Sequence, residues 1–176
     1  PVRVSVVVVV RNEAANLGAL LDDLAGQTHP PHCFEVLIAD DGSTDGTPQL
    51  VRDYAARAPF RLRLLTLPAD AARAPKKAGI THAIALATGE LIATTDGDCR
   101  VGPQWLALLA GCYRRTGAAL LSGGVTFAGE KNLFEKMQTV EFASLVGSGA
   151  CALGWHFPTM CNGANLAYAK TAFLAV

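Results

Sequence analysis

The sequence predicts an α/β fold in which helices cover both faces of a mainly parallel sheet. Strand-like and helix-like segments alternate along the chain, which is the order in which crossover helices join parallel strands. The first strand-like segment, 4–10, is a continuous β-branched run, as expected for a strand covered on both faces. Further strands are expected at 35–39, 61–67 and 91–95. In such sheets ligands bind beyond the carboxyl ends of the strands, near the switch in strand order.

Helices are predicted between these strands from the spacing of apolar residues. Asn12 is expected to open the first helix, and Thr47-Pro48 supplies the N-cap and first residue of the second. The third helix is expected over 75–88 and ends at Gly89, and Gly102-Pro103 starts the fourth. The inward positions of the first three helices are Leu17, Leu20, Leu21 and Leu24; Leu50, Val51 and Tyr54; and Ile80, Ala83, Ile84 and Ala87.

Composition narrows the choice of partners and compartment. A length of 176 residues suits one domain with a substantial core. Fifteen basic residues balance fifteen acidic ones, so no net basic field attracts nucleic acid or an anionic membrane. No uninterrupted apolar run reaches the roughly 20 residues that span a bilayer. Five cysteines without CxxC spacing favour reduced thiols in the cytoplasm over a zinc site.

Acidic residues follow two of the predicted strands at the point where each strand ends. Asp40 and Asp41 come directly after the second strand, and Asp96-Gly97-Asp98 comes directly after the fourth. Arg11-Asn12-Glu13 follows the first strand in the same way. Carboxylates two residues apart in an extended segment point to one side, and carboxylate oxygens are the ligands that Mg²⁺ and Mn²⁺ prefer. A common Asp-Gly turn is the alternative for each motif alone, but three polar strand ends on one edge favour a binding site.

Together these motifs resemble glycosyltransferase family 2, a family of inverting enzymes with the GT-A fold. The matching stretches follow the order and spacing of the family: SVVVVVRNEAAN, EVLIADDGSTDGT, KKAGITHAIALATGELIATTDGD and CNGANLAYAKTAF. The resemblance implies a three-layer GT-A sandwich that binds a nucleoside-diphosphate sugar, with a UDP-sugar favoured. It also implies a divalent cation, Mn²⁺ or Mg²⁺, and transfer of the sugar to the hydroxyl of a saccharide or lipid-linked acceptor. Polysaccharide or glycolipid biosynthesis is the expected setting.

The resemblance assigns roles to individual residues on the donor side. It places Arg11, Glu13 and Asp41 at the nucleoside, with Asp40 beside them. Two further residues follow from the same family pattern. Asp98 becomes the principal metal ligand, and Asp96 is its companion toward the ribose. Lys76 matches a family lysine that approaches the diphosphate, whereas Thr81 stands where the family often has asparagine.

The acceptor side is expected in the last third of the chain. Gly163 and Asn165 belong to a family element in which a strand passes beneath the donor sugar. Glycine there permits close backbone approach, and Asn165 can hydrogen-bond phosphate or sugar hydroxyls. Beyond a helix expected over 130–149, residues Trp155, His156 and Phe157 are interpreted as core or interface packing or as the lining of an acceptor cleft.

The family pattern also leads us to expect a longer protein. Inversion requires a base that takes the proton of the acceptor hydroxyl, and the family places this acid about twenty residues beyond the Gly-Ala-Asn element. The catalytic base is therefore expected beyond Val176. We accordingly predict one domain, with residues 1–100 as its nucleotide-binding half and 101–176 as the start of its acceptor half. A cytoplasmic location is expected, with possible membrane contact through segments outside this chain.

Three alternatives remain open from the residues. A phosphoacceptor receiver domain also gathers acids and a lysine at strand ends, but its acidic pair ends the first strand rather than the second. A sugar-nucleotide pyrophosphorylase needs a glycine-rich loop after the first strand, and Arg11-Asn12-Glu13-Ala14 contains no glycine. A nucleotide-sugar-binding module without transferase activity is the non-enzymatic alternative.

Overall fold

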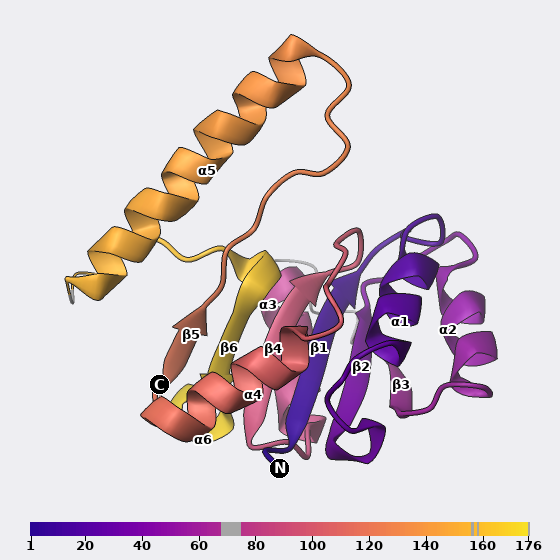
Figure 1. Ribbon diagram of the computed structural model, residues 1–176. Coiled ribbons are helices and arrows are strands. Elements are labelled where there is room, and N and C mark those ends of the chain that lie inside the picture. The colour runs from indigo at the N-terminus through magenta and orange to yellow at the C-terminus, as the bar shows by residue number, and fades with distance from the viewer. Residues whose placement is uncertain (68–74, 156, 158, 176) are drawn as a thin grey trace.

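The protein is a six-stranded, mainly parallel sheet with helices on both faces, as the computed structural model of the chain shows (Figure 1). The structure describes residues 1–67, 75–155, 157 and 159–175. The strand order is β3-β2-β1-β4-β6-β5, in which β1 to β4 run parallel and β6 runs antiparallel to both neighbours. The strands are β1 (Val4–Val10), β2 (Phe34–Asp40), β3 (Arg61–Thr66), β4 (Leu91–Asp96), β5 (Leu120–Ser122) and β6 (Leu166–Ala169). The predicted α/β architecture is confirmed.

The helices divide between the two faces of the sheet, with α3 behind it and α1, α2 and α4 in front in the view of Figure 1. Their bounds are α1 (Leu17–Ala25), α2 (Thr47–Ala55), α3 (Pro75–Leu86), α4 (Trp105–Thr116), α5 (Leu133–Gly154) and α6 (Lys170–Leu174). Two short 3₁₀ turns, η1 (Pro31–Cys33) and η3 (Gly163–Asn165), precede β2 and β6. Crossover helices on both faces explain why the central strands are apolar throughout.

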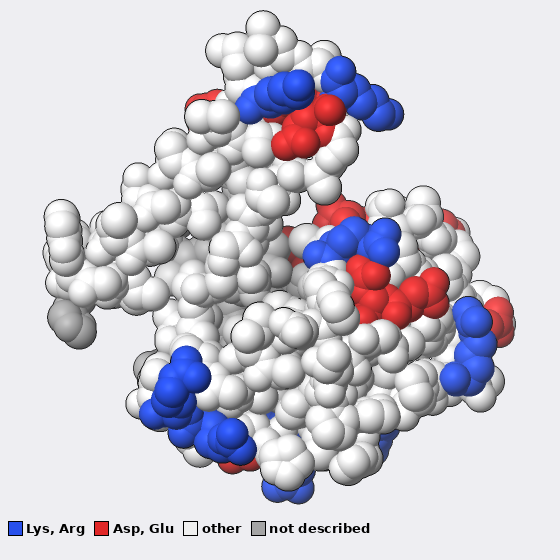
Figure 2. Space-filling view, viewed as in Figure 1, with Lys and Arg blue, Asp and Glu red and all other residues white. Residues whose placement is uncertain are grey.

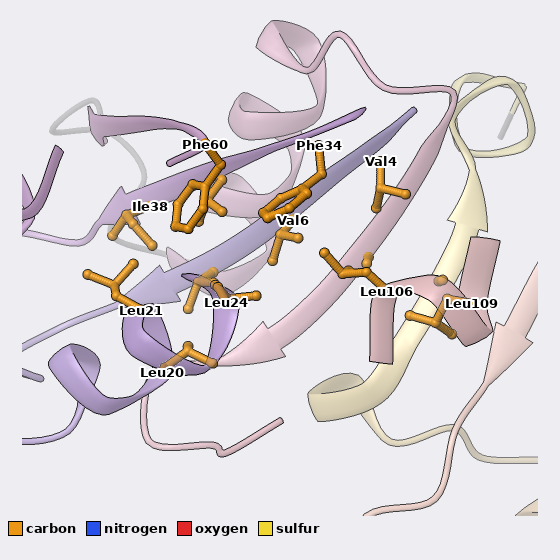
Figure 3. Close-up of a cluster of buried hydrophobic side chains, with 14 of the residues drawn as sticks. Val4, Val6, Leu20, Leu21, Leu24, Phe34, Ile38, Phe60, Leu106 and Leu109 are labelled. Carbon is orange, nitrogen blue, oxygen red and sulfur yellow. The ribbon is translucent and has the colours of Figure 1, made fainter. Parts of the chain in front are cut away.

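The alternation of side chains along β1 divides the core in two. Val4, Val6, Val8 and Val10 join the cluster beneath α1, α2 and α4, whereas Val7 joins the smaller cluster beneath α3. Figure 3 shows the leucines of α1 and α4 turned toward strand residues of the larger cluster. The four leucines predicted to face inward from the first helix are all fully buried. The parallel strands are therefore packed on both faces by buried hydrophobic clusters. This close packing fixes the positions of their carboxyl ends.

Three predicted helix starts were wrong. Asn12 does not open α1, which begins at Leu17; instead Asn12 has a φ of 57°, a left-handed conformation that asparagine tolerates. Gly46 rather than Thr47 flanks the first turn of α2, and the fourth helix begins at Trp105, beyond the predicted Gly102-Pro103 start. At Asn12 the local capping signal is overridden by contacts between loops, as its hydrogen bonds show below.

Helix α5 extends away from the sheet (Figure 1), and several of its large apolar side chains are exposed. It starts at an Asn132 cap, whose side chain accepts a hydrogen bond from the Glu135 N–H. Within α5 only Gly149 is buried. Trp155 and Phe157, which follow it, are 84% and 73% exposed, so the core-packing interpretation of these two is wrong; His156 lies outside the described residues. Among the described residues, no helix combines the length and apolarity needed to cross a bilayer.

Candidate functional site

The candidate site lies at the carboxyl edge of the sheet, where the strand order switches. The chain passes from β1 to β2 and β3 on one side, and then returns to place β4 on the other side of β1. The register aligns Val10 with Asp40 and Val9 with Asp96. The two acidic motifs predicted from the sequence therefore flank the end of β1 at one level, which is where ligands of such sheets bind.

The loops that follow β1 and β2 are tied together by hydrogen bonds. The backbone N–H of Asn12 donates to the Ser43 hydroxyl over 2.9 Å, and the Thr44 N–H donates to the Asn12 side-chain oxygen over 2.8 Å. The N–H of Glu13 donates to the Thr47 hydroxyl over 2.9 Å. The left-handed backbone of Asn12 permits this arrangement. The two loops therefore form one rigid shelf beside the end of β1.

Asp40 and Asp41 have different surroundings on this shelf. Asp40 is 5% exposed, and its carboxylate accepts the Ser43 N–H at 3.3 Å. Asp41 is only partly buried and lies 3.4 Å from the guanidinium of Arg11, which is largely exposed. Asp40 thus shapes the turn, whereas the Arg11–Asp41 pair presents polar groups that a ligand can reach.

The triplet after β4 is held close to the loop after β1. A Cβ on buried Gly97 would stand 2.9 Å from Val10 Cγ1 and 3.2 Å from Glu13 Cγ, so only glycine fits without a shift. Glu13 therefore packs against the triplet, while its carboxylate accepts a hydrogen bond from Asn16. Asp98 is exposed, and its carboxylate has no hydrogen-bond or ion-pair partner in the described part of the chain.

Lys76 and Asp96 form an ion pair at the centre of the site. The distance from Lys76 Nζ to Asp96 Oδ1 is 2.6 Å, and their side chains are 58% and 35% exposed. The pair lies on the rim of a mainly apolar cavity of about 400 Å³ between α3, β4 and β6. A Cβ added to Gly163 would be 3.9 Å from Lys76 Nζ, and the Thr94 hydroxyl donates to the Gly163 carbonyl over 3.0 Å. Three elements that are distant in sequence therefore meet here.

The side chain of Asn165 connects η3 to its surroundings. Its oxygen accepts a hydrogen bond from the Trp105 indole over 2.9 Å, and its amide nitrogen donates to the Gly124 carbonyl over 2.9 Å. Both ends of the amide thus bond protein groups, so Asn165 positions η3 between α4 and the segment after β5. The expected contact of Asn165 with phosphate or sugar hydroxyls stays a prediction.

The ligands available to a cation are few. In the described parts of the chain, no three acidic, histidine or cysteine side chains gather closely enough to hold a metal ion. Asp96 and Asp98 offer the carboxylate oxygens that Mg²⁺ and Mn²⁺ prefer, and such ions usually complete their shell with water and substrate phosphate. The residues therefore fit a cation shared with a diphosphate, provided that Lys76 releases Asp96.

Sequence reasoning missed the hydroxyl groups that support the site. Thr94 anchors Gly163, and the Thr47 hydroxyl both accepts from Glu13 and donates to Asp45 over 2.6 Å. Thr95 is 3% exposed, and its hydroxyl has no partner among the described residues. The available signal was the pair of threonines that ends an otherwise apolar strand, because buried polar groups need partners.

The fold and the site define the class of protein, and comparison with known proteins names the family. Acidic strand ends at the switch point of a mainly parallel sheet are features of a nucleotide-dependent α/β enzyme. The family model for glycosyl transferase family 2 matches residues 5–169. The chain therefore belongs to glycosyl transferase family 2, as the sequence motifs predicted.

Relatives of known description support this membership. The glycosyltransferase AglE of Haloferax volcanii is 33% identical over 124 residues, which are 70% of this chain and 40% of the relative. The dodecaprenyl-phosphate galacturonate synthase of Rhizobium johnstonii is 35% identical over 121 residues, 68% of this chain and 35% of the relative. The chain thus spans two fifths or less of the length of these two proteins.

Solved structures identify the fold as GT-A. Residues 1–349 of S. aureus TarS, in a crystal structure with UDP, are 29% identical with a TM-score of 0.62, and the match covers 74% of this chain and 38% of that one. The mannosyltransferase PcManGT from Pyrobaculum calidifontis, in complex with GDP-Man and Mn²⁺, has a TM-score of 0.67 and 24% identity. It covers 96% of this chain and 44% of its own, and at this identity the likeness concerns the fold alone.

Proposed function

We propose that this chain is the donor-binding part of an enzyme that transfers a sugar from a nucleoside-diphosphate sugar to an acceptor hydroxyl, with inversion. The observation that carries the proposal is the convergence of the predicted acids on one edge: Asp40 pairs with Val10 and Asp96 with Val9, on opposite sides of the end of β1. Membership of glycosyl transferase family 2 supplies the reaction class. A receiver domain or a pyrophosphorylase has no comparable support.

UDP is the proposed nucleotide. The support is the resemblance of the motifs together with TarS, whose crystal structures include complexes with UDP and with UDP-GlcNAc. Arg11, Glu13 and Asp41 bind the nucleoside, because they line the shelf formed by the loops after β1 and β2. The buried Asp40 holds the turn that carries them.

A divalent cation, Mn²⁺ or Mg²⁺, is the proposed cofactor, held by Asp98 and Asp96. When bound, it neutralises the charge of the departing diphosphate. Lys76 contributes a second positive charge on the same side, since its Nζ lies at the rim of the cavity beside Gly163. Charge-assisted hydrogen bonds of this kind are roughly twice as strong as neutral ones.

A lipid-linked acceptor is favoured over a free saccharide. The relatives include the dodecaprenyl-phosphate galacturonate synthase and a beta-monoglucosyldiacylglycerol synthase of Nostoc, 30% identical over 142 residues. In this chain no charged residue occurs from Phe142 to Ala169, a stretch that leads from α5 into Gly163. The C-terminal half of α5 accordingly shows no charge in Figure 2, whereas charged side chains gather near its start.

The test is a calorimetric screen of UDP-, GDP- and dTDP-sugars with Mn²⁺, followed by a transfer assay on the full-length protein. We expect binding of UDP-sugars in preference to the others, and a product whose anomeric configuration, read by NMR, is opposite to that of the donor. Retention of configuration would contradict inversion. Failure of every nucleotide sugar to bind would contradict the proposed function itself.

A further inference from the structure

In the Lys76–Asp96 ion pair, Lys76 occupies a carboxylate oxygen that the proposed cation would also use. Asp96 is proposed to bind a cation, yet one of its carboxylate oxygens already lies 2.6 Å from an ammonium group. A cation that approached this oxygen would meet a like charge at close range, which costs free energy even at high dielectric. Asp98, two residues away, carries no such partner among the described residues. The two carboxylates of the motif are therefore unequal in this structure.

We infer that Lys76 is the resident counter-ion of Asp96, and that it makes cation binding depend on the nucleotide. This inference rests on the proposed function. A bare cation must displace the ammonium group from Asp96 and then remain beside it. A diphosphate changes the balance, because it offers the displaced Lys76 new anionic oxygens and offers the cation additional ligands. The cation and the nucleotide therefore bind together, and each strengthens the binding of the other.

The surroundings of Lys76 suit such an exchange. Its side chain is 58% exposed and stands in the first turn of α3, so it can swing without unpacking the core. It lines the same cavity as Gly163, and a Cβ added to Gly163 would stand 3.9 Å from its Nζ. A lysine is a flexible point charge rather than a planar fork, which makes it suited to changing partners. Lys76 is thus a positioning residue that couples the binding of the cation to the binding of the nucleotide.

The same helix offers a matched control. Lys77 is adjacent in sequence, exposed, and lines the same cavity, but it forms no ion pair with Asp96. Substituting either lysine removes one positive charge from the first turn of α3. Only the Lys76 substitution frees the carboxylate. A difference between the two variants therefore reports the ion pair rather than the general field of the helix.

The experiment measures Mn²⁺ alone by electron paramagnetic resonance and UDP by calorimetry, on the full-length protein and its Lys76→Gln and Lys77→Gln variants. We expect Lys76→Gln to bind bare Mn²⁺ about three- to tenfold more tightly, since a competing partner worth up to ~1 kcal/mol is gone. The same variant should bind UDP in saturating Mn²⁺ roughly tenfold more weakly, because the lysine contact with the diphosphate is lost. Lys77→Gln should change the Mn²⁺ affinity less than twofold.

The opposite signs of the two shifts distinguish the inference from simpler roles. Unchanged or weaker Mn²⁺ binding by Lys76→Gln, with UDP binding still impaired, overturns the counter-ion role while leaving the proposed function intact. Absence of Mn²⁺ binding by wild type and variant, both with and without UDP, overturns the proposed metal site and this inference together. Lys76→Arg keeps the positive charge and should bind bare Mn²⁺ with the affinity of the wild type. Equal thermal stability of all variants checks that the fold is unaffected.

Discussion

The two edges of the sheet hold acidic residues in contrasting states. At the amino edge, Glu35 is 3% exposed, and one carboxylate oxygen accepts hydrogen bonds from the Ser5 hydroxyl and from the N–H and hydroxyl of Thr88, over 2.6 to 2.8 Å. At the carboxyl edge, Asp98 is exposed, without a partner in the described residues. The Glu35 carboxylate, which accepts hydrogen bonds from the protein, therefore stabilises the fold. The exposed Asp98 carboxylate is instead available to a ligand.

Glycines close the chain tightly at both edges, but with different results. A Cβ on Gly89 would stand 2.5 Å from the Ser5 N atom, and the Gly89 N–H donates to the Ser5 hydroxyl. This contact extends the hydrogen-bond network of Glu35, which is 3% exposed. At the other edge Gly97 packs against Val10 and Glu13, which leaves Asp98 beyond it in the open. A tightly packed glycine therefore lies beside a buried carboxylate at the amino edge and beside an exposed carboxylate at the carboxyl edge.

The largest expected effect concerns the open edge. Asp98→Ala should weaken UDP binding in the presence of Mn²⁺ by on the order of a hundredfold or more, since it removes the proposed principal ligand of the cation. The unfolding free energy should change little, because Asp98 has no partner to lose in the described structure. Calorimetry and urea denaturation measure the two quantities. A large loss of stability would place Asp98 in the same class as Glu35.

The matching substitution at the closed edge should have the reverse outcome. Glu35→Ala leaves the Thr88 N–H and the Ser5 hydroxyl without their acceptor, which should lower the unfolding free energy by about 2–3 kcal/mol. UDP affinity should stay within twofold of wild type under conditions where the variant is folded. Weaker nucleotide binding by a folded Glu35→Ala would break the separation between the two edges.

A smaller effect is expected from Asp41, which lies between these extremes. It is partly buried and pairs with exposed Arg11. Asp41→Ala should weaken UDP and uridine alike by roughly tenfold, because the lost contact is to the nucleoside rather than to the cation. Parallel titrations with UDP and uridine measure this. If uridine affinity does not change, Asp41 serves only the turn after β2.

The smallest effect is a pH dependence of stability at the closed edge. Burial raises the pKa of Glu35, but the hydrogen bonds from Thr88 and Ser5 and the charge of Arg61 outweigh it, so the pKa lies below its usual 4.5. A carboxyl with a depressed folded-state pKa stabilises fully above its unfolded pKa and loses that contribution as pH falls through the folded value. Wild type should therefore lose stability below about pH 4.5 more steeply than Glu35→Gln. Parallel urea midpoints for the two proteins would contradict this.

Local pattern was enough to predict β1 to β4 and the acids at the ends of β2 and β4, whereas β5 was not predicted. The run 4–10 and the motifs around Asp40 and Asp96 are read from neighbouring residues, and parallel topology brings them to one edge. The remaining features depend on contacts between distant residues. The conformation of Asn12 is set by Thr44, 32 residues away, and the Lys76–Asp96 pair joins residues 20 apart. Side-chain partners of this kind carry no signal in local sequence.

The surroundings of helix α5 were also not predictable from local sequence. Its helical character was predictable from its residues, and its bounds differ from the predicted 130–149 by a few residues at each end. Its exposure was not predictable: Leu133, Phe134 and Val140 are each about 70% exposed. Apolar spacing indicates that a helix has a face to cover, but it does not indicate which part of the molecule covers that face.

The most direct test of the account is a titration of the wild-type protein with UDP, once in Mn²⁺ and once in EDTA. We propose that the carboxylates at the end of β4 bind a cation that is shared with the diphosphate. We predict that UDP binds on the order of a hundredfold or more tightly in Mn²⁺ than in EDTA, because the cation adds charged contacts that EDTA removes. Equal UDP affinity in Mn²⁺ and in EDTA would contradict the binding of the diphosphate through a cation at this site.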